Sequence, residues 1–177
     1  MSETLEPALP QDLDELAERW MRDLCERDLK VATAESCTGG MLASLLTDIE
    51  GCGHGFDRGF VTYSKEAKTE LLGIEPLLLD RNDAVSEAVA RAMAEGALGR
   101  SGADIAISVT GFAGPAGDGK EEGLVHFALA SKQADTAHRV EHYGARGRGP
   151  IRIAALRTML EMLDEATGGL SSEEGKR

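Results

Sequence analysis

A serine lies where a short apolar segment gives way to small polar residues. Residues 32–40 read Ala-Thr-Ala-Glu-Ser-Cys-Thr-Gly-Gly, and a helical pattern begins near Met41. This predicts a strand, a tight turn at Ser36, and a helix whose first N–H groups and positive dipole end favour an anion. A serine there suits nucleophilic attack with stabilisation of an oxyanion. Ser36 and Thr38 are also of the types that cap helices, so capping is the alternative.

A lysine is the second candidate for chemistry. Ser64 is predicted to cap a short helix that ends near Gly73 and carries Lys65 and Lys68. An amine beside a serine hydroxyl can take its proton if desolvation brings the amine pKa toward neutrality. Periodicity does not choose between the two lysines, and most lysines are simply solvated. Tyr63, at the end of the preceding strand, is a further candidate.

A glycine-rich loop is predicted over residues 111–123. Its stretch from Gly114 to Lys120 has the spacing of a phosphate-binding loop, but Glu121 stands where a hydroxyl must bind magnesium, and a strand follows instead of a helix. We therefore reject a nucleotide triphosphatase. The first part of the loop, residues 110–115, follows a buried strand and carries small residues that let backbone N–H groups approach a ligand. A plain wide turn is the alternative.

Arginines gather before the last predicted helix. Arg146, Arg148 and Arg152 surround Pro150, a residue favoured in the first turn of a helix. Guanidinium groups at a helix N-terminus suit an anion such as a phosphate monoester. A solvated basic loop is the alternative.

The cysteines and histidines indicate no metal centre. Cys25, Cys37 and Cys52 form no CxxC pair, and an odd number of thiols argues against a disulfide framework. His138 and His142 fall on one face of a predicted strand, without a third ligand. Cys37 is interpreted as a small buried residue beside the serine, with a thiol nucleophile left open.

The elements that must position these residues alternate along the chain. We expect strands at 29–34, 60–63, 103–109, 124–130 and 136–143, and helices at 11–28, 39–48, 64–73, 84–98 and around 153–163. Residues 103–109 are continuously apolar, which is typical of a strand covered on both faces. The alternation predicts an α/β fold, a single-domain layered α/β/α arrangement with a mixed sheet. A flexible leader over 1–10 and a disordered tail over 167–177 flank it.

The overall composition excludes several classes of partner. The chain has 177 residues and a formal net charge of -12. It shows no cluster of basic residues of the kind that binds the phosphate backbone of nucleic acid. No apolar run approaches the roughly 20 residues of a membrane span. The acidic N-terminus lacks the features of a secretory signal, so a cytoplasmic protein is expected.

Taken together, these motifs resemble the CinA C-terminal-domain family, whose stand-alone members are nicotinamide-nucleotide amidohydrolases. The resemblance covers roughly residues 11–166, a span that accounts for the predicted domain. The motifs that carry it are Thr33–Gly40, Arg58–Ser64, Glu66–Lys68, Leu72-Gly73, Ala84–Glu87, Ser108–Pro115 and Gly123–Val125.

The resemblance implies conversion of nicotinamide mononucleotide and water to nicotinate mononucleotide and ammonia. Ser36 would be the nucleophile, Lys68 the general base, and Tyr63 an aid to orientation or proton transfer, with no metal and no cofactor. Backbone N–H groups from Cys37 to Gly39 would form the oxyanion hole. The implied substrate-binding residues are Cys37, Thr38, Gly39, Thr110, Gly111, Gly114, Arg148 and Arg152. The resemblance also suggests a homodimer or larger homo-oligomer.

Two departures from the family pattern leave other functions open. The loop at 116–122 is shorter than is usual in the family, and Arg146-Gly-Arg148 stands where the family tends to have Gly-Asp-Arg. The alternatives are a catalytically silent nucleotide-binding or interaction module, and an amidohydrolase for another small amide.

Overall fold

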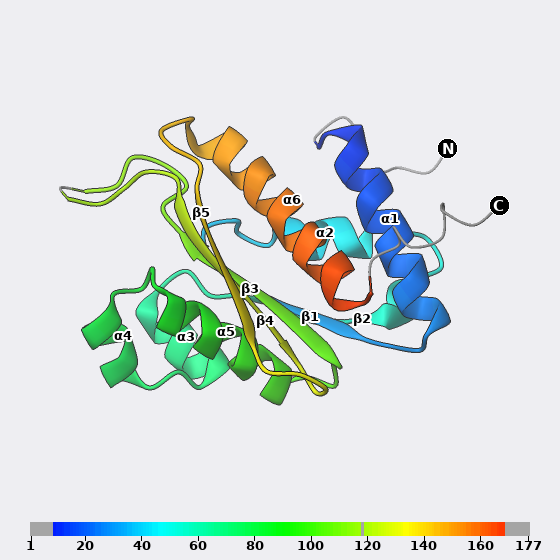
Figure 1. The fold of residues 1–177 in the computed structure, drawn as a ribbon. Coiled ribbons are helices and arrows are strands. Elements are labelled where there is room, and N and C mark those ends of the chain that lie inside the picture. Colours follow the sequence, from blue (N-terminus) through cyan, green and yellow to red (C-terminus); the bar gives the residue numbers. More distant parts are fainter. Residues whose placement is uncertain (1–8, 118, 169–177) are drawn as a thin grey trace.

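A computed structural model describes residues 9–117 and 119–168, in which a mixed sheet lies between two layers of helices (Figure 1). The strands are β1 (Val31–Glu35), β2 (Phe56–Val61), β3 (Ile105–Gly111), β4 (Leu124–Ser131) and β5 (Ala137–His142). The helices are α1 (Gln11–Glu26), α2 (Met41–Thr47), the 3-10 turn η1 (Gly53–Gly55), α3 (Lys65–Leu72), α4 (Pro76–Asn82), α5 (Glu87–Gly99) and α6 (Arg148–Ala166). The predicted α/β/α class with a mixed sheet is confirmed.

The sheet topology brings the candidate residues to one edge. The strand order is β2-β1-β3-β4-β5; β2, β1 and β3 run parallel, and β4 and β5 are antiparallel to their neighbours. Every residue of β1 is buried, as expected for a central strand. Glu35 pairs with Val61 on one side and with Val109 on the other. The segments that follow β1, β2 and β3 therefore leave the sheet together, at its carboxyl edge.

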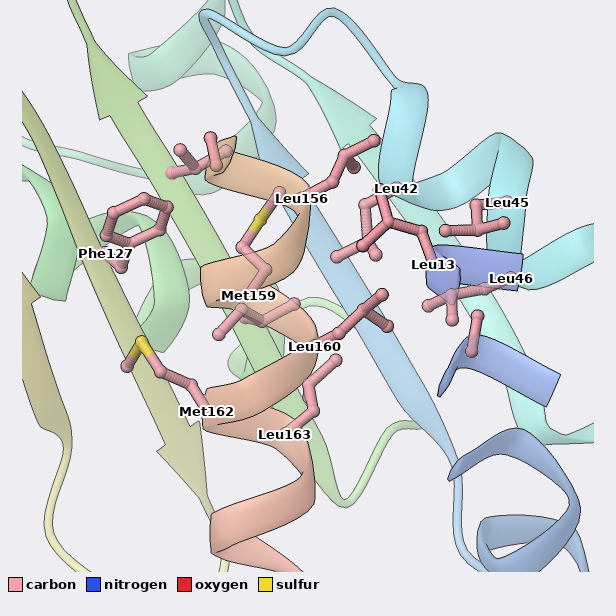
Figure 2. Close-up of a cluster of buried hydrophobic side chains, with 14 of the residues drawn as sticks. Leu13, Leu42, Leu45, Leu46, Phe127, Leu156, Met159, Leu160, Met162 and Leu163 are labelled. Carbon is pink, nitrogen blue, oxygen red and sulfur yellow. The ribbon is translucent and has the colours of Figure 1, made fainter. Parts of the chain in front are cut away.

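The larger hydrophobic core lies between the sheet and the layer formed by α1, α2 and α6 (Figure 1). Leu13 of α1, Leu42 of α2 and Leu160 of α6 converge there and are fully buried (Figure 2). Burying a leucine side chain contributes roughly 1.5–3 kcal/mol. This packing holds the start of α2 and the start of α6 against the edge where the chemistry is expected.

The opposite face of the sheet is covered by α3, α4 and α5 (Figure 1). Small side chains let α5 approach closely: Ala90 and Ala94 pack with Ala128 and Ala130 of β4. Ser108 of β3 donates a hydrogen bond of 2.7 Å to the Ala90 carbonyl. The alanine-rich composition of α5 thus serves a tight helix–sheet contact.

The structure differs from the predicted elements at several boundaries. Strand β2 begins at Phe56 instead of residue 60, because its polar residues lie on a sheet edge and leave no apolar run to recognise. It ends at Val61, so Tyr63 lies beyond it. Helix α4 was not predicted, although Pro76 at its first turn is a start signal. Helix α6 begins already at Arg148.

The predicted leader and tail lie mostly outside the described residues, which exclude 1–8 and 169–177. The described part of the leader is ordered: Leu9 is buried and Pro10 is the N-cap of α1. Within residues 9–117 and 119–168, none of the helices is both long and apolar enough to span a bilayer.

Candidate active site

Ser36 lies on a sharp turn directly after β1. Its backbone N–H donates to the Val109 carbonyl at 3.1 Å, which ties the turn to β3. Gly39 and Gly40 then adopt φ angles of +65° and +92°, a region that favours glycine, before α2 begins at Met41. The strand–turn–helix prediction is confirmed, and the hydroxyl is presented at the carboxyl edge of the sheet.

The carboxylate of Glu35 fixes this turn, a role that was not predicted from the sequence. Glu35 is fully buried and accepts hydrogen bonds from the backbone N–H groups of Gly40 (3.1 Å), Leu42 (3.2 Å) and Ala43 (2.8 Å). The Thr38 hydroxyl donates to it as well, at 2.6 Å. The expectation that the start of α2 awaits an external anion is therefore wrong, because a carboxylate of the chain already occupies it.

The capping alternative for Ser36 is also wrong. The N-cap of α2 is Gly40, which makes no side-chain cap bond, and the Thr38 side chain is bonded to Glu35 instead. The Ser36 hydroxyl instead meets the amine of Lys68, with 3.1 Å between Oγ and Nζ. Two residues that are 32 positions apart in the chain thus form a buried pair.

The amine of Lys68 is held by three oxygen atoms. Besides the Ser36 hydroxyl, Nζ contacts the carbonyls of Thr62 at 2.7 Å and Tyr63 at 3.4 Å. Helix α3 fixes the stem, since Ser64 caps it by accepting from the Ala67 N–H at 3.0 Å. In the neutral amine, two N–H bonds directed at the two carbonyls leave the lone pair for the Ser36 hydroxyl proton.

Burial lowers the pKa of Lys68 toward neutrality. The Lys68 side chain is fully buried, and desolvation lowers its pKa from 10.5 to about 8. Lys65, the competing lysine, is instead on the surface and pairs with Asp80 at 3.1 Å. The structure therefore distinguishes the two lysines, which periodicity could not do.

The thiol of Cys37 is poorly suited to nucleophilic attack. It is 4% exposed, and burial raises its pKa to about 12. A thiol in such surroundings stays protonated near neutral pH and behaves as an apolar group. The nearby hydroxyl of Ser36 is the group that contacts the amine of Lys68.

Two backbone N–H groups of the turn are suitably free to stabilise an oxyanion. Within the described part of the chain, the N–H groups of Cys37 and Thr38 donate to no carbonyl or carboxylate. The N–H of Gly39 is taken by the Ser36 carbonyl at 3.2 Å, so the expected set from Cys37 to Gly39 is too wide. Both remaining groups lie directly after the serine, so they are close to the point where an oxyanion would form on attack by Ser36.

The N-terminal turns of α6 bring two arginines to the same edge. Arg152 donates from Nε to the Cys37 carbonyl at 2.7 Å. Arg148, one turn earlier, lies against Gly114, where a Cβ would come within 2.9 Å of its guanidinium. The arginine cluster and the small residues after β3 thus meet beside the serine turn, which the sequence could suggest only as separate features.

Thr110 and Gly111 have structural contacts of their own. The Thr110 hydroxyl donates to the Ala84 carbonyl at 2.7 Å. A Cβ on Gly111 would lie 2.7 Å from Val125 and 2.8 Å from the Leu124 carbonyl. These contacts hold the end of β3 against the segment before α5 and against β4, so both residues shape the edge of the site through its backbone.

The structure does not bring the phenol of Tyr63 to the Ser36–Lys68 pair. Its side chain is 71% exposed, and within the described residues its hydroxyl makes no hydrogen bond with either member. Its carbonyl, by contrast, accepts from Lys68 at 3.4 Å. The contribution of Tyr63 seen in the structure is therefore made by its backbone.

Other grouped polar residues lie away from the pair. Among residues 9–117 and 119–168, no three His, Cys, Asp or Glu side chains are arranged to hold a metal ion. A groove of about 470 Å³ between α3 and α4 is lined by Lys65, Glu66 and Asp80 among others, and Lys68 is not one of its lining residues. Ser36 is not among the lining residues of this groove either.

Comparison with known proteins places this arrangement in a family. The model of the CinA C-terminal domain matches residues 13–167. The chain belongs to the CinA C-terminal domain family. It is 50% identical to a CinA-like protein of Chlorobaculum tepidum over 80% of this chain but 36% of that protein. The chain spans about a third of the length of the first curated relatives of the family that it matches.

Two further relatives are matched along nearly their whole length. The nicotinamide-nucleotide amidohydrolase PncC of Escherichia coli is 42% identical over 86% of this chain and 93% of its own. The crystal structure of the competence/damage inducible protein CihA from Agrobacterium tumefaciens is 46% identical, with a TM-score of 0.87 over 90% of this chain and 98% of that one. The fold described above is thus that of the CinA superfamily.

Proposed function

We propose that the protein is an amidohydrolase that converts nicotinamide mononucleotide and water to nicotinate mononucleotide and ammonia. The observation that carries the proposal is the buried contact of 3.1 Å between the Ser36 hydroxyl and the amine of Lys68. The proposal is also supported by the sequence similarity to PncC, which extends over nearly all of that protein.

The first half of the reaction forms an acyl-enzyme. Neutral Lys68 takes the hydroxyl proton while Ser36 Oγ attacks the carboxamide carbon, and the carbonyl oxygen becomes an oxyanion. The N–H groups of Cys37 and Thr38 donate to that oxyanion. The lysine, now an ammonium, passes its proton to the departing nitrogen, so ammonia leaves and an ester of Ser36 remains.

The second half returns the enzyme to its starting state. Lys68, neutral again, takes a proton from water as the water oxygen attacks the ester carbon. The tetrahedral intermediate collapses, Ser36 Oγ recovers a proton from Lys68, and the carboxylate product is released. Each step uses a side chain or backbone group of this chain, and no metal or cofactor takes part in it.

The two arginines of α6 are proposed to bind the phosphate. The start of α2 is filled by Glu35, so that helix offers no place for a second anion. Arg148 and Arg152 lie one turn apart at the same edge, and Arg152 keeps N–H donors beyond the one bonded to Cys37. Guanidinium groups pair well with phosphate oxygens.

The proposal is tested by ammonia release from nicotinamide mononucleotide. Wild type and the control Ser44→Ala, an exposed serine of α2, are expected to release ammonia, and Ser36→Ala is expected to lose activity by at least about 10³-fold. Equal release by Ser36→Ala would show that Ser36 is not the nucleophile.

Two other functions are outcomes of the same experiment. Tight binding of substrate by calorimetry without turnover by wild type would indicate a catalytically silent nucleotide-binding module. If ammonia is released only from other compounds in a panel of small amides, the serine mechanism would stand and the protein would be an amidohydrolase for another small amide. We also propose, from the family resemblance, a homo-oligomer located in the cytoplasm.

A further inference from the structure

A lysine side chain lies on an aromatic ring in the segment between β3 and β4. The Nζ of Lys120 is 5.0 Å from the centre of the Phe112 ring. The same amine is 3.1 Å from a carboxylate oxygen of Asp83, in the connection between α4 and α5. The ammonium group therefore lies between an aromatic face and a carboxylate. The first attracts it through a cation–π interaction and the second through an ion pair.

The base of this segment is rigid, so the ring has a defined place. The N–H of Phe112 donates to the Leu124 carbonyl at 2.9 Å, and the N–H of Gly123 donates to the Phe112 carbonyl at 2.8 Å. These bonds continue the pairing of β3 with β4 beyond the last strand residues. The Phe112 ring is thus attached to backbone that is fixed by the hydrogen bonds between β3 and β4.

The ring also belongs to the edge that carries the serine. Val109, whose carbonyl holds the Ser36 N–H, is three residues before Phe112, and Gly114, which lies against Arg148, is two residues after it. Phe112 is two residues after Thr110, whose hydroxyl donates to the Ala84 carbonyl in the segment before α5, so strand alternation directs both toward the layer of α3 and α5. The two arginines lie on α6, in the opposite layer (Figure 1).

Asp83 lies beside the end of β3 that holds the serine turn. Its neighbour Ala84 accepts a hydrogen bond of 2.7 Å from the Thr110 hydroxyl. Thr110 directly follows Val109, whose carbonyl accepts from the Ser36 N–H. The hydrogen bond from Lys120 lowers the pKa of the Asp83 carboxyl. The carboxylate of Asp83 is therefore tied to the same strand end as Ser36.

We propose that the Phe112 ring and Asp83 form the subsite for the positively charged pyridinium ring of the substrate, and that Lys120 occupies this subsite in the structure described here. The inference rests on the proposed function. A pyridine nitrogen bonded to ribose carries a permanent positive charge, while the phosphate at the other end of the molecule is negative. An aromatic face with a carboxylate on one side and two guanidinium groups on the other complements both charges.

The inference makes Lys120 a competitor of the substrate. The ammonium and the pyridinium ring cannot share one ring face and one carboxylate, so the lysine must leave when substrate binds. Removal of the lysine charge is therefore expected to strengthen binding, and removal of the ring to weaken it. If the contacts of Lys120 served only to stabilise this loop, both changes would instead weaken binding.

The test compares Phe112→Leu and Lys120→Gln with wild type, with Lys132→Gln as control because Lys132 forms a similar surface pair with Asp104. The first probe is nicotinamide mononucleotide, whose hydrolysis is followed by ammonia release. The second is its benzamide analogue, which has an uncharged ring and is added as a competitor of the first. We expect Phe112→Leu to raise KM about two- to five-fold and Lys120→Gln to lower it by a similar factor. Neither should change the inhibition constant of the benzamide analogue as much, and Lys132→Gln should change neither constant.

Equal effects of Phe112→Leu on the charged and uncharged rings would overturn the inference, since the ring would then supply only apolar contact. A raised KM in Lys120→Gln would overturn it as well. If wild type releases ammonia and all three variants match it, the subsite fails while the proposed function stands. If wild type neither hydrolyses the mononucleotide nor binds it by calorimetry, both fail.

Discussion

Replacement of Lys68 by methionine tests whether the folded protein really holds this amine at a lowered pKa. Burial lowers the pKa from 10.5 to about 8. Since each pKa unit corresponds to about 1.4 kcal/mol, keeping the ammonium buried at neutral pH costs the folded state about 3 kcal/mol. Methionine has a similar length without the charge, but it leaves the Ser36 hydroxyl and the Thr62 carbonyl without their donor, at a cost of about 1–2 kcal/mol.

The free energy of unfolding is therefore expected to depend on pH differently in the two proteins. Between pH 8 and 10.5 the unfolded wild type binds the lysine proton and the folded wild type does not, so wild-type stability rises with pH across that window. Lys68→Met lacks this gain. The variant should be about 1–2 kcal/mol more stable than wild type at pH 7 and less stable by a similar amount above pH 10.5.

Urea unfolding at pH 7 and pH 10.5 measures this difference directly. Lys132→Met serves as the control, because Lys132 is an exposed lysine whose pairing with Asp104 is on the surface. Its stability difference from wild type should change between the two pH values by no more than the contribution of an exposed ion pair, about 0.2–1 kcal/mol. A constant difference between Lys68→Met and wild type would refute the reasoning, since it would mean that folding leaves the pKa of Lys68 unchanged.

Three further substitutions test the positioning of the site. Glu35→Gln replaces an acceptor of three backbone N–H groups by an amide and should lower the urea-derived free energy of unfolding by about 2–4 kcal/mol; a loss within 0.5 kcal/mol would show that the carboxylate does not hold the turn. Gly111→Ala forces a Cβ to within 2.8 Å of the Leu124 carbonyl and should cost about 1–3 kcal/mol, whereas Gly99→Ala, with open space around it, should not destabilise; equal effects would contradict the contact. Arg152→Lys loses the bidentate fork and should raise KM for the mononucleotide about ten-fold with kcat changed less, and an unchanged KM would remove Arg152 from the phosphate site.

Much of the fold could be predicted because periodic patterns report local burial. The apolar spacing of Leu13, Leu16, Ala17, Trp20 and Leu24 predicted α1; Leu16 is half-buried and the other four are fully buried. Edge strand β2 was only half recognised, since its residues face solvent and carry little periodic pattern. Helix α4 is too short to show a helical period and was missed.

The site was predicted in its parts but not in its arrangement. The sequence marked Ser36 as a turn residue and left Lys65 and Lys68 undecided, because only tertiary packing decides which lysine loses contact with water. Glu35 was missed as a positioning residue, although an acidic residue at the end of an otherwise apolar strand was a visible signal. Its burial follows from the backbone donors that surround it, and these exist only once α2 has formed.

The dependence of kcat/KM on pH, measured by ammonia release from nicotinamide mononucleotide, tests the Ser36–Lys68 mechanism most directly. The base must be neutral to take the serine proton, so the rate should rise with pH and reach half of its plateau near pH 8, where Lys68 titrates. Lys65→Met should keep that profile, and Lys68→Met should lose both the activity and the rise. A profile that is flat from pH 6 to 10, or one that Lys68→Met retains, would contradict a lysine base.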